Sequence, residues 1–198
     1  QAWKKIILIA PRPYKLIDLA DTIKETSPQC EVAYATKPDD YLGEADLIIT
    51  TTSAQGKKIL DIEKVKSGCV ICDVSRPFDI QEEDAAKRPD VLVIASGEVE
   101  LPGDVKLTCD IGLEGQVVYA CLAETAILAL EGRFESFSLS RDISYKKVIE
   151  IDRLARKHGV KLSAIMGHQH EITEEEINLA RKKAKERKEN DEKKHELC

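Results

Sequence analysis

Short apolar runs alternate with segments of helical periodicity along the first hundred residues. The apolar runs cover residues 6–10, 31–35, 45–50, 69–74 and 91–95. Residues 14–26 and 58–66 instead place their apolar side chains at helical spacing. Apolar runs of this length, bounded by turn formers, are typical of parallel strands covered on both faces. The pattern therefore predicts an α/β fold, a Rossmann-like doubly wound parallel sheet.

The remaining chain is predicted to be mainly helical. Helices are expected over 116–131 and 144–158, because each apolar pattern is closed by a glycine. A short strand is expected over 160–165. The charged residues 171–198 should form an exposed helix that frays into disorder, and Thr173 and Glu176 have the spacing of a capping box. We therefore expect three parts, namely 1–111, 112–170 and 171–198.

Polar residues follow the predicted strands, where doubly wound sheets bind their ligands. The candidate cofactor-binding residues at these positions are Arg12, Thr52, Ser53, Ser75, Arg76 and Gly97. Hydroxyl groups and a glycine there suit a dinucleotide, although the same residue types also form ordinary turns. An arginine after the second Rossmann strand suits a 2′-phosphate, so Arg12 favours NADPH. We accordingly interpret residues 1–111 as an incomplete NADP-binding domain.

One strand of the predicted sheet is missing from the sequence. The chain has no G-x-G-x-x-G motif, which normally follows the first Rossmann strand. If residues 6–10 are the second strand of the order 3-2-1-4-5-6, the missing first strand would lie centrally, beside the run at 45–50. The sequence then predicts a gap with two unpaired strand edges, and a complete protein that continues upstream of Gln1.

Cys121 and Glu124 lie in the apolar helix predicted over 116–131, three residues apart on one face. Near the start of a helix the macrodipole favours a thiolate. A thiolate beside a carboxylate suits covalent catalysis on a thioester or aldehyde carbonyl. Cysteine is also a common buried residue that packs as a small hydrophobe, so core packing is the alternative for Cys121.

Other cysteines and histidines carry weaker predictions. Cys69 and Cys72 form a C-x-x-C pair within a predicted strand, where alternation would point the two thiols to opposite faces and favours core packing. His158 precedes Gly159 and is expected at a helix carboxyl terminus. His168 and His170 are expected in a solvated turn, so no metal site is predicted.

Composition limits the partners. A net charge of −6 and a pI near 5.4 argue against nucleic acid, since phosphate binding needs clustered basic residues. No apolar run reaches the roughly 20 residues of a membrane-spanning helix. Six cysteines in a chain that starts without a signal peptide favour a reducing compartment, so a cytoplasmic location is expected.

From residue 6 to about residue 165 the chain resembles the aldehyde-forming long-chain acyl-carrier-protein reductases of cyanobacterial type, together with related predicted amino-acid dehydrogenases. The segments that carry the resemblance are 8–12, 44–48, 72–77, 96–99, 119–125 and 157–159. The resemblance implies that Cys121 accepts an acyl group from acyl carrier protein or coenzyme A, with Glu124 beside it, and that NADPH releases a fatty aldehyde. The family's glycine-rich loop and amino-terminal domain have no counterpart here.

Two alternatives remain open from the sequence. The first is a shikimate-type or amino-acid-type NAD(P) dehydrogenase with direct hydride transfer, in which Cys121 has only a packing role. The second is a non-catalytic nucleotide-binding or protein-interaction module. The leading prediction is an NADP-dependent reductase that converts a fatty acyl thioester to an aldehyde through an acyl-cysteine.

Overall fold

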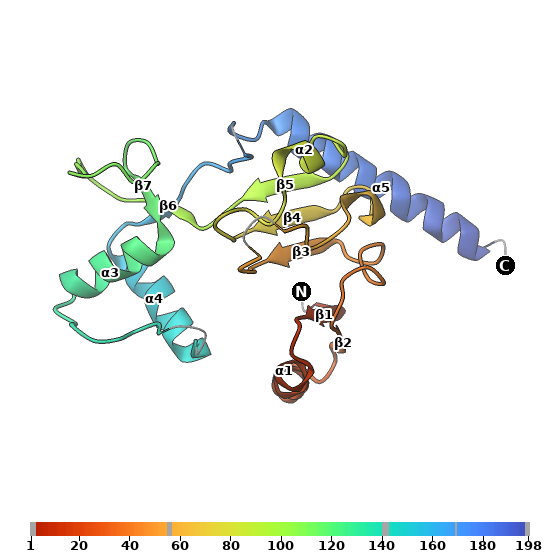
Figure 1. Ribbon diagram of the computed structural model, residues 1–198, viewed down its shortest axis with the longest axis horizontal. Helices are drawn as coiled ribbons and strands as arrows, with labels where there is room; N and C mark the ends of the chain where they lie inside the picture. The colour runs from red at the N-terminus through yellow and green to blue at the C-terminus, as the bar shows by residue number, and fades with distance from the viewer. Residues whose placement is uncertain (1–2, 55–56, 140–142, 169, 197–198) are drawn as a thin grey trace. The chain divides into compact units, whose positions relative to one another are not determined.

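The computed structural model describes residues 3–54, 57–139, 143–168 and 170–196 (Figure 1). By packing, the chain divides into two units. Unit 1 comprises Gln1–Ala95 and Gly167–Cys198, and unit 2 comprises Ser96–Met166. The three-part division at 111/112 and 170/171 was based on residue character, and it stays a prediction.

Unit 1 holds two parallel sheets, shown as separate ribbons in Figure 1. The first sheet pairs β1 (Lys5–Ile9) with β2 (Glu31–Ala35), connected through α1 (Pro13–Thr26). The second has the order β3 (Leu47–Thr50), β4 (Val70–Asp73), β5 (Leu92–Ala95). Each predicted apolar run overlaps one of these strands, and β1 begins one residue before its predicted run. The prediction of a mixed α/β fold with parallel strands is therefore confirmed.

The core of unit 1 lies against the second sheet. Strands β4 and β5 bury alternate side chains, as expected for a strand with one face on a core. The buried cluster consists of Leu42, Leu60, Ile62, Val65, Cys69, Ile71, Ile80, Val91 and Val93. Two short helical segments, η1 (Ile62–Lys64) and α2 (Glu82–Ala85), lie in the connections around β4.

The helix predicted over 58–66 is wrong, because only the 3-10 helix η1 forms there. Asp61 accepts a hydrogen bond from the Glu63 N–H and starts the turn, and Val65 is already extended. Ile62 and Val65 are both buried. A spacing of three residues brings two side chains to one face in a 3-10 turn as well as in an α-helix. The periodicity alone could not separate the two structures.

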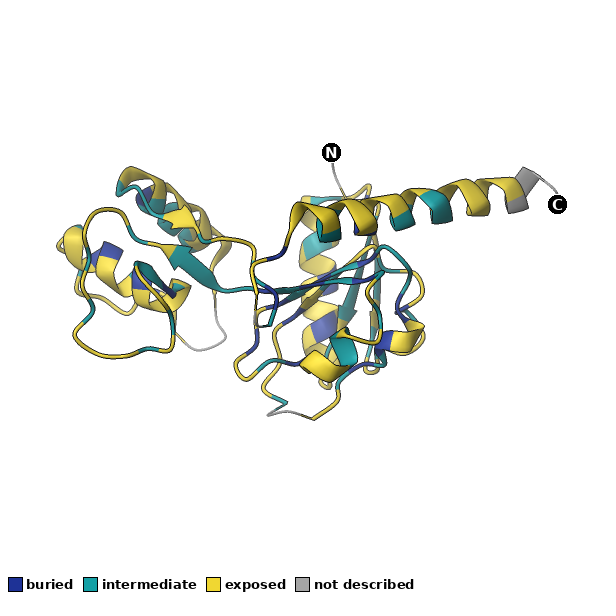
Figure 2. Ribbon diagram, turned by 90° about the horizontal axis from the view of Figure 1, so that it is seen from above, coloured by how far each residue is buried: buried dark blue, intermediate teal, exposed yellow. Residues whose placement is uncertain are grey.

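The charged tail forms α5 (Glu174–Glu196). The predicted capping box is confirmed, because the Thr173 N–H donates to Glu176 Oε2 at 2.8 Å and the Glu176 N–H donates to Thr173 Oγ1 at 3.3 Å. The hydrogen bond from the Thr173 N–H lowers the pKa of Glu176 most, and the hydrogen bond with His170 has the next largest effect. Most of α5 is exposed (Figure 2), but Ala180 is buried. Composition did not predict this packing.

Unit 2 contains a small antiparallel sheet and two helices. Its strands run in the order β7 (Val117–Tyr119), β6 (Glu98–Glu100), β8 (Lys161–Leu162), and its helices are α3 (Ala120–Leu130) and α4 (Tyr145–Lys157). The two helices predicted here are confirmed, although α3 begins at Ala120 because the preceding residues pair with β6. Gly132 and Gly159 follow the helix ends with positive φ angles, as expected for glycine there.

Among the described residues, no helix combines the length and the apolar character needed to cross a membrane. This finding agrees with the hydropathy of the sequence.

Candidate functional site

The loops that follow β3 and β4 meet at the carboxyl ends of these strands in unit 1. Asp79 joins them, since its Oδ1 accepts a hydrogen bond from Thr52 Oγ1 at 2.5 Å. Its Oδ2 accepts from Ser75 Oγ at 2.5 Å and from the Thr52 N–H at 3.1 Å. The Thr52 N–H also donates to Ser75 Oγ at 2.9 Å. Two of the predicted site residues, Thr52 and Ser75, are thus brought together by a carboxylate that sequence reasoning missed.

Asp73 shapes the second of these loops. It is the last residue of β4 and is fully buried. Its Oδ1 accepts from the Ser75 N–H at 3.0 Å, and its Oδ2 accepts from the Ile80 N–H at 2.9 Å. The segment between these two amides contains a cis peptide bond before Pro77. Asp73 therefore holds both ends of the loop that presents Asp79.

Two buried carboxyl groups thus lie at one end of this sheet. Asp73 and Asp79 are 0% and 4% exposed. The hydrogen-bond donors to these two carboxyl groups are amides and hydroxyls, which fix the orientation of each group. A cationic group bound beside them would be favoured electrostatically.

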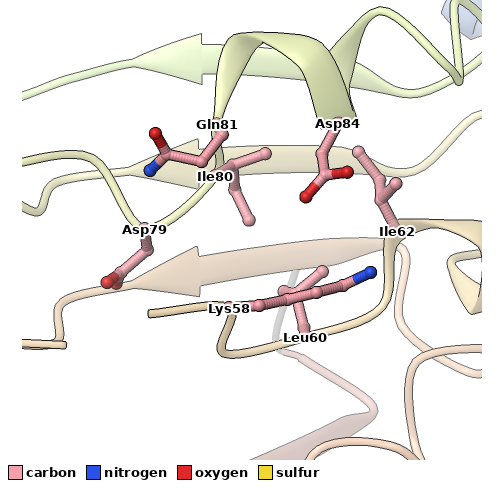
Figure 3. A pocket seen from close by; sticks show the side chains of 7 residues that line it. All are labelled: Lys58, Leu60, Ile62, Asp79, Ile80, Gln81 and Asp84. Carbon is pink, nitrogen blue, oxygen red and sulfur yellow. The ribbon is translucent and has the colours of Figure 1, made fainter. Parts of the chain in front are cut away.

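A small cavity of about 50 Å³ adjoins Asp79 (Figure 3). One wall comes from the segment before η1 and the other from the segment after β4. The lining residues are Lys58, Leu60, Ile62, Asp79, Ile80, Gln81 and Asp84. Lys58 Nζ donates to Asp61 at 3.3 Å, and Lys87 Nζ donates to Asp84 at 2.5 Å. The hydrogen bond from the Lys87 ammonium lowers the pKa of Asp84.

A larger open hollow of about 290 Å³ shares Ile80 and Gln81 with the small cavity. Its other lining residues are Pro77, Phe78, Glu82, Glu83 and His168. His168 is half-buried rather than in a solvated turn, because its Nε2 bonds to the Ile80 carbonyl at 2.6 Å and its ring meets Phe78 edge-on at 5.1 Å. Acidic residues line both spaces, and the Lys58 side chain also lines the small cavity.

The other predicted cofactor-binding residues do not take part in the Thr52–Ser75–Asp79 side-chain network, although Arg76 adjoins it. Arg12 is exposed at the start of α1, and Ser53 is exposed in the loop after β3. Arg76 is exposed, donates to the Ser75 carbonyl at 2.9 Å and stacks 4.2 Å from the Phe78 ring centre. Gly97 belongs to unit 2, has a φ of 97°, and its carbonyl accepts from the Ala120 N–H. Their role in a site stays a prediction.

The predicted nucleophile lies in unit 2. Cys121 is the second residue of α3 and is exposed, so the alternative of core packing is wrong. Glu124 is half-buried, and Ser138 Oγ donates to its Oε1 at 2.5 Å. Thr125 Oγ1 donates to the Cys121 carbonyl at 3.2 Å. The catalytic role of Cys121 and Glu124 stays a prediction.

The C-x-x-C pair behaves as strand alternation predicts. Cys69 is fully buried in the core of unit 1, and burial raises its pKa to about 11. Cys72 is half-buried, three positions along the same extended segment and therefore on the other face. His158 is the residue after α4, where its N–H donates to the Leu154 carbonyl, as expected. The described residues contain no group of three or more metal-ligating side chains.

The chain is similar in sequence to a curated protein. No family model matches the chain. Over 154 residues the chain is 35% identical to a protein named Aminotransferase PigE from Serratia sp. (strain ATCC 39006). The matched stretch covers 76% of this chain but only 18% of the relative. The chain therefore spans about a fifth of the length of this relative.

This relative corrects the functional prediction. The prediction of an NADP-dependent reductase that converts a fatty acyl thioester to a fatty aldehyde is wrong, because the named relative is an aminotransferase. NADPH is wrong for the same reason, and so is the alternative of an NAD(P) dehydrogenase. The wrong prediction of NADPH has a physical reason. Hydroxyl and glycine residues after parallel strands suit many polar ligands. An arginine after a strand can also be an exposed residue at the start of a helix, as Arg12 is.

Proposed function

We propose that residues 1–198 are part of an aminotransferase-type protein and that unit 1 binds the amino group of a small substrate. The relative named an aminotransferase supports the first half of this proposal. The observation that supports the second half is the buried carboxyl pair, Asp73 and Asp79, at the carboxyl ends of two parallel strands. Ligands of α/β sheets bind at this edge.

Asp79 has room for one ammonium hydrogen bond. A carboxylate offers about four acceptor positions. Three are filled, by the Thr52 N–H, the Thr52 hydroxyl and the Ser75 hydroxyl. These neutral donors fix the direction of the carboxyl group. An ammonium group in the cavity would lie on a lining that holds Asp79, Asp84 and the Gln81 amide together with the Lys58 side chain. A neutral alcohol of equal size would lack the charge interaction.

The described residues do not fit pyridoxal phosphate, the cofactor that an aminotransferase relative suggests. This cofactor is held through a lysine, with an acid at its ring nitrogen and a site for its phosphate. Lys58 lines the small cavity, but a volume of about 50 Å³ holds only a few waters. No lysine is among the residues that line the larger hollow. We therefore assign substrate binding, and no cofactor chemistry, to this part of the chain.

We further propose that unit 1 is a Rossmann-like, doubly wound sheet. The two parallel sheets and the crossover helix α1 support this arrangement. A cytoplasmic location stays a prediction that the free cysteines support. The acyl carrier protein or coenzyme A partner and the resemblance to acyl-carrier-protein reductases also stay predictions, and no observation on the described residues bears on them.

The proposal is tested by titrating the ¹⁵N-labelled protein with ethylamine, with glycine and with ethanol. Ethylamine and glycine are expected to shift the Thr52, Ser75 and Ile80 amide signals in a saturable manner, and ethanol is not. Asp79→Asn should weaken amine binding about tenfold, the effect of losing one charge-assisted hydrogen bond of about 1.4 kcal/mol. Asp39→Asn, which changes an exposed acid paired with Lys64, should have no effect.

Asp84→Asn provides a second variant, because Asp84 lines the cavity but lies outside the Thr52–Ser75–Asp79 network. It should weaken amine binding even if Asp79→Asn disturbs the loop. An equal response to ethanol and ethylamine would refute the proposal. Amine binding that is unchanged in both aspartate variants would refute it as well.

A further inference from the structure

Among the described residues, strand β1 pairs with another strand along only one of its two edges. The Glu31 N–H donates to the Lys4 carbonyl at 2.9 Å, and the Ala10 N–H donates to the Ala35 carbonyl at 3.3 Å. In a parallel pair, the N–H and C=O of one residue point to the same side, and the side alternates along the strand. Even-numbered positions of β1 therefore face β2. The main-chain groups of the remaining positions face the opposite edge, and these positions are Lys5, Ile7 and Ile9.

Strand β3 is open in the same way. The Val70 N–H donates to the Asp46 carbonyl at 3.1 Å, and the Val74 N–H donates to the Thr50 carbonyl at 3.0 Å. Even-numbered positions thus face β4, and the main-chain groups of Leu47 and Ile49 face away from it. Within the described ranges, β1 pairs only with β2, and β3 pairs only with β4. Two parallel strands of unit 1 therefore each present one unpaired edge.

The side chains on these strands indicate a buried environment that the chain alone does not supply. Strand β1 reads Lys-Ile-Ile-Leu-Ile, an apolar run typical of a strand covered on both faces, yet none of its side chains is buried. Ile9 is 38% exposed, Leu47 is 37% exposed and Ile49 is 61% exposed. Strands β4 and β5 bury every second residue. Edge strands in natural proteins usually carry charged residues, prolines or bulges that prevent further pairing. In β1 and β3, Lys5 is the only charged residue, and neither strand contains a proline.

We propose that β1 and β3 receive one further parallel strand between them, supplied by polypeptide outside residues 1–198. The occupant is an extended apolar segment of about five residues, the usual strand length, with β-branched side chains on both faces and no charge at its centre. It joins the two sheets into one six-stranded sheet in the order β2, β1, inserted strand, β3, β4, β5. The open main-chain groups on β1 and β3 become its hydrogen-bond partners. This inference does not depend on the proposed amine binding.

Parallel orientation follows from the rest of unit 1. Every strand pair there is parallel, and β1 reaches β2 through a helical crossover. A parallel strand next to β1 needs a connection of a dozen or more residues.

The experiment therefore fuses a Val/Ile strand to Gln1 through a flexible linker of about 15 residues, which also gives an effective concentration in the millimolar range. The control fusion carries proline at the centre of the strand, where it removes a ladder donor.

Amide exchange followed residue by residue by NMR tests the insertion. In the fusion, the N–H groups of Ile7, Ile9, Leu47 and Ile49 are expected to exchange at least tenfold more slowly than in the unfused chain. The N–H groups of Ile6 and Ile48 already face a paired strand and should change much less. The proline control should leave all of these rates as in the unfused chain. This alternating pattern separates insertion from a general gain in stability.

A pair of host variants provides the matched control. Ile49→Pro removes a donor that faces the open edge, so the unfused chain should keep its fold and its urea midpoint, and the fusion should lose the protection of Leu47. Ile48→Pro removes a donor to β4 and should destabilise the chain with or without the fused strand. Exchange that is unchanged at Ile7 and Ile49 in the fusion overturns the proposal. Protection of one edge alone, or a dimer in size-exclusion chromatography, also overturns it, since either result means edge pairing rather than insertion.

Discussion

Gly68 lies where α5 packs closely on the sheet of unit 1, and replacing it with alanine is expected to displace this helix. A Cβ atom at position 68 would lie 2.3 Å from the backbone nitrogen of Ala184 and 2.6 Å from its Cα. Both are backbone atoms, so no side-chain rotation can relieve the contact. Gly68 also has a φ of +77°, which L residues rarely adopt. Gly68→Ala therefore introduces backbone strain and a direct clash with α5.

The expected loss of stability is about 3 kcal/mol. The left-handed backbone contributes about 1 kcal/mol for an alanine. Displacing α5 breaks the hydrogen bond from Arg187 to the Ser67 carbonyl at 2.8 Å, worth about 1 kcal/mol. It also exposes the buried side of the helix around Ala180, another ~1 kcal/mol. The ion pair of Arg187 with Asp46 adds little, because the Asp46 side chain is 74% exposed.

Urea unfolding and limited trypsin digestion measure the two effects separately. Gly103→Ala is the control, because Gly103 has a φ of +84° and a Cβ added there would meet no atom within 4 Å, so this variant tests backbone strain alone. We expect Gly103→Ala to cost about 1 kcal/mol and to leave α5 resistant to trypsin. Gly68→Ala should cost about three times as much and expose the lysines of α5 to cleavage. Equal costs in the two variants, with α5 still resistant in Gly68→Ala, would refute the reasoning.

Two further predictions concern thiols and acid stability. Cys109 and Cys121 are exposed and should react with iodoacetamide in the native protein at pH 8. Cys69, whose pKa is raised to about 11 by burial, should react only after denaturation. Peptide mass spectrometry measures the labelling of each cysteine, and rapid labelling of Cys69 in the native protein would contradict the prediction. Arg88 donates to both Asp90 oxygens at 2.8 Å and lowers the pKa of Asp90 to about 2. Because this folded-state pKa lies below the ordinary value of about 3.9, the stabilisation is present above pH 4 and is lost as the pH falls toward 2. Asp90→Asn should cost about 1 kcal/mol at pH 7 and little at pH 2.5, and an equal cost in urea unfolding at both pH values would show that the pair does not stabilise the fold.

The strands and helix ends could be read from the sequence because their causes are local. Each of the five apolar runs overlaps a strand of unit 1. Gly132 and Gly159 end their helices through the left-handed conformation that glycine alone adopts easily. Thr173 and Glu176 form their capping box within a single turn. Local hydrogen bonds and side-chain alternation need no knowledge of the rest of the chain.

The candidate site was only partly predictable. Thr52 and Ser75 were expected at the strand ends because doubly wound sheets bind ligands there. Asp79 was missed, although it unites them, because its position depends on the path of the loop that Asp73 holds. The cofactor was predicted wrongly, because residue types after a strand do not determine the charge and size of the space between them. An acidic pair beside a small cavity became visible only with the loops in place.

The sequence by itself thus determined which segments are extended, which are helical and where several of them end. Only the tertiary structure decided that 62–64 is a 3-10 turn, that α5 packs on Gly68, that Cys121 is exposed, and which edge of β1 and of β3 stays open. Alternation and capping act over a few neighbouring residues, whereas pairing, burial and the meeting of loops depend on contacts between residues far apart in the chain, which no local pattern encodes.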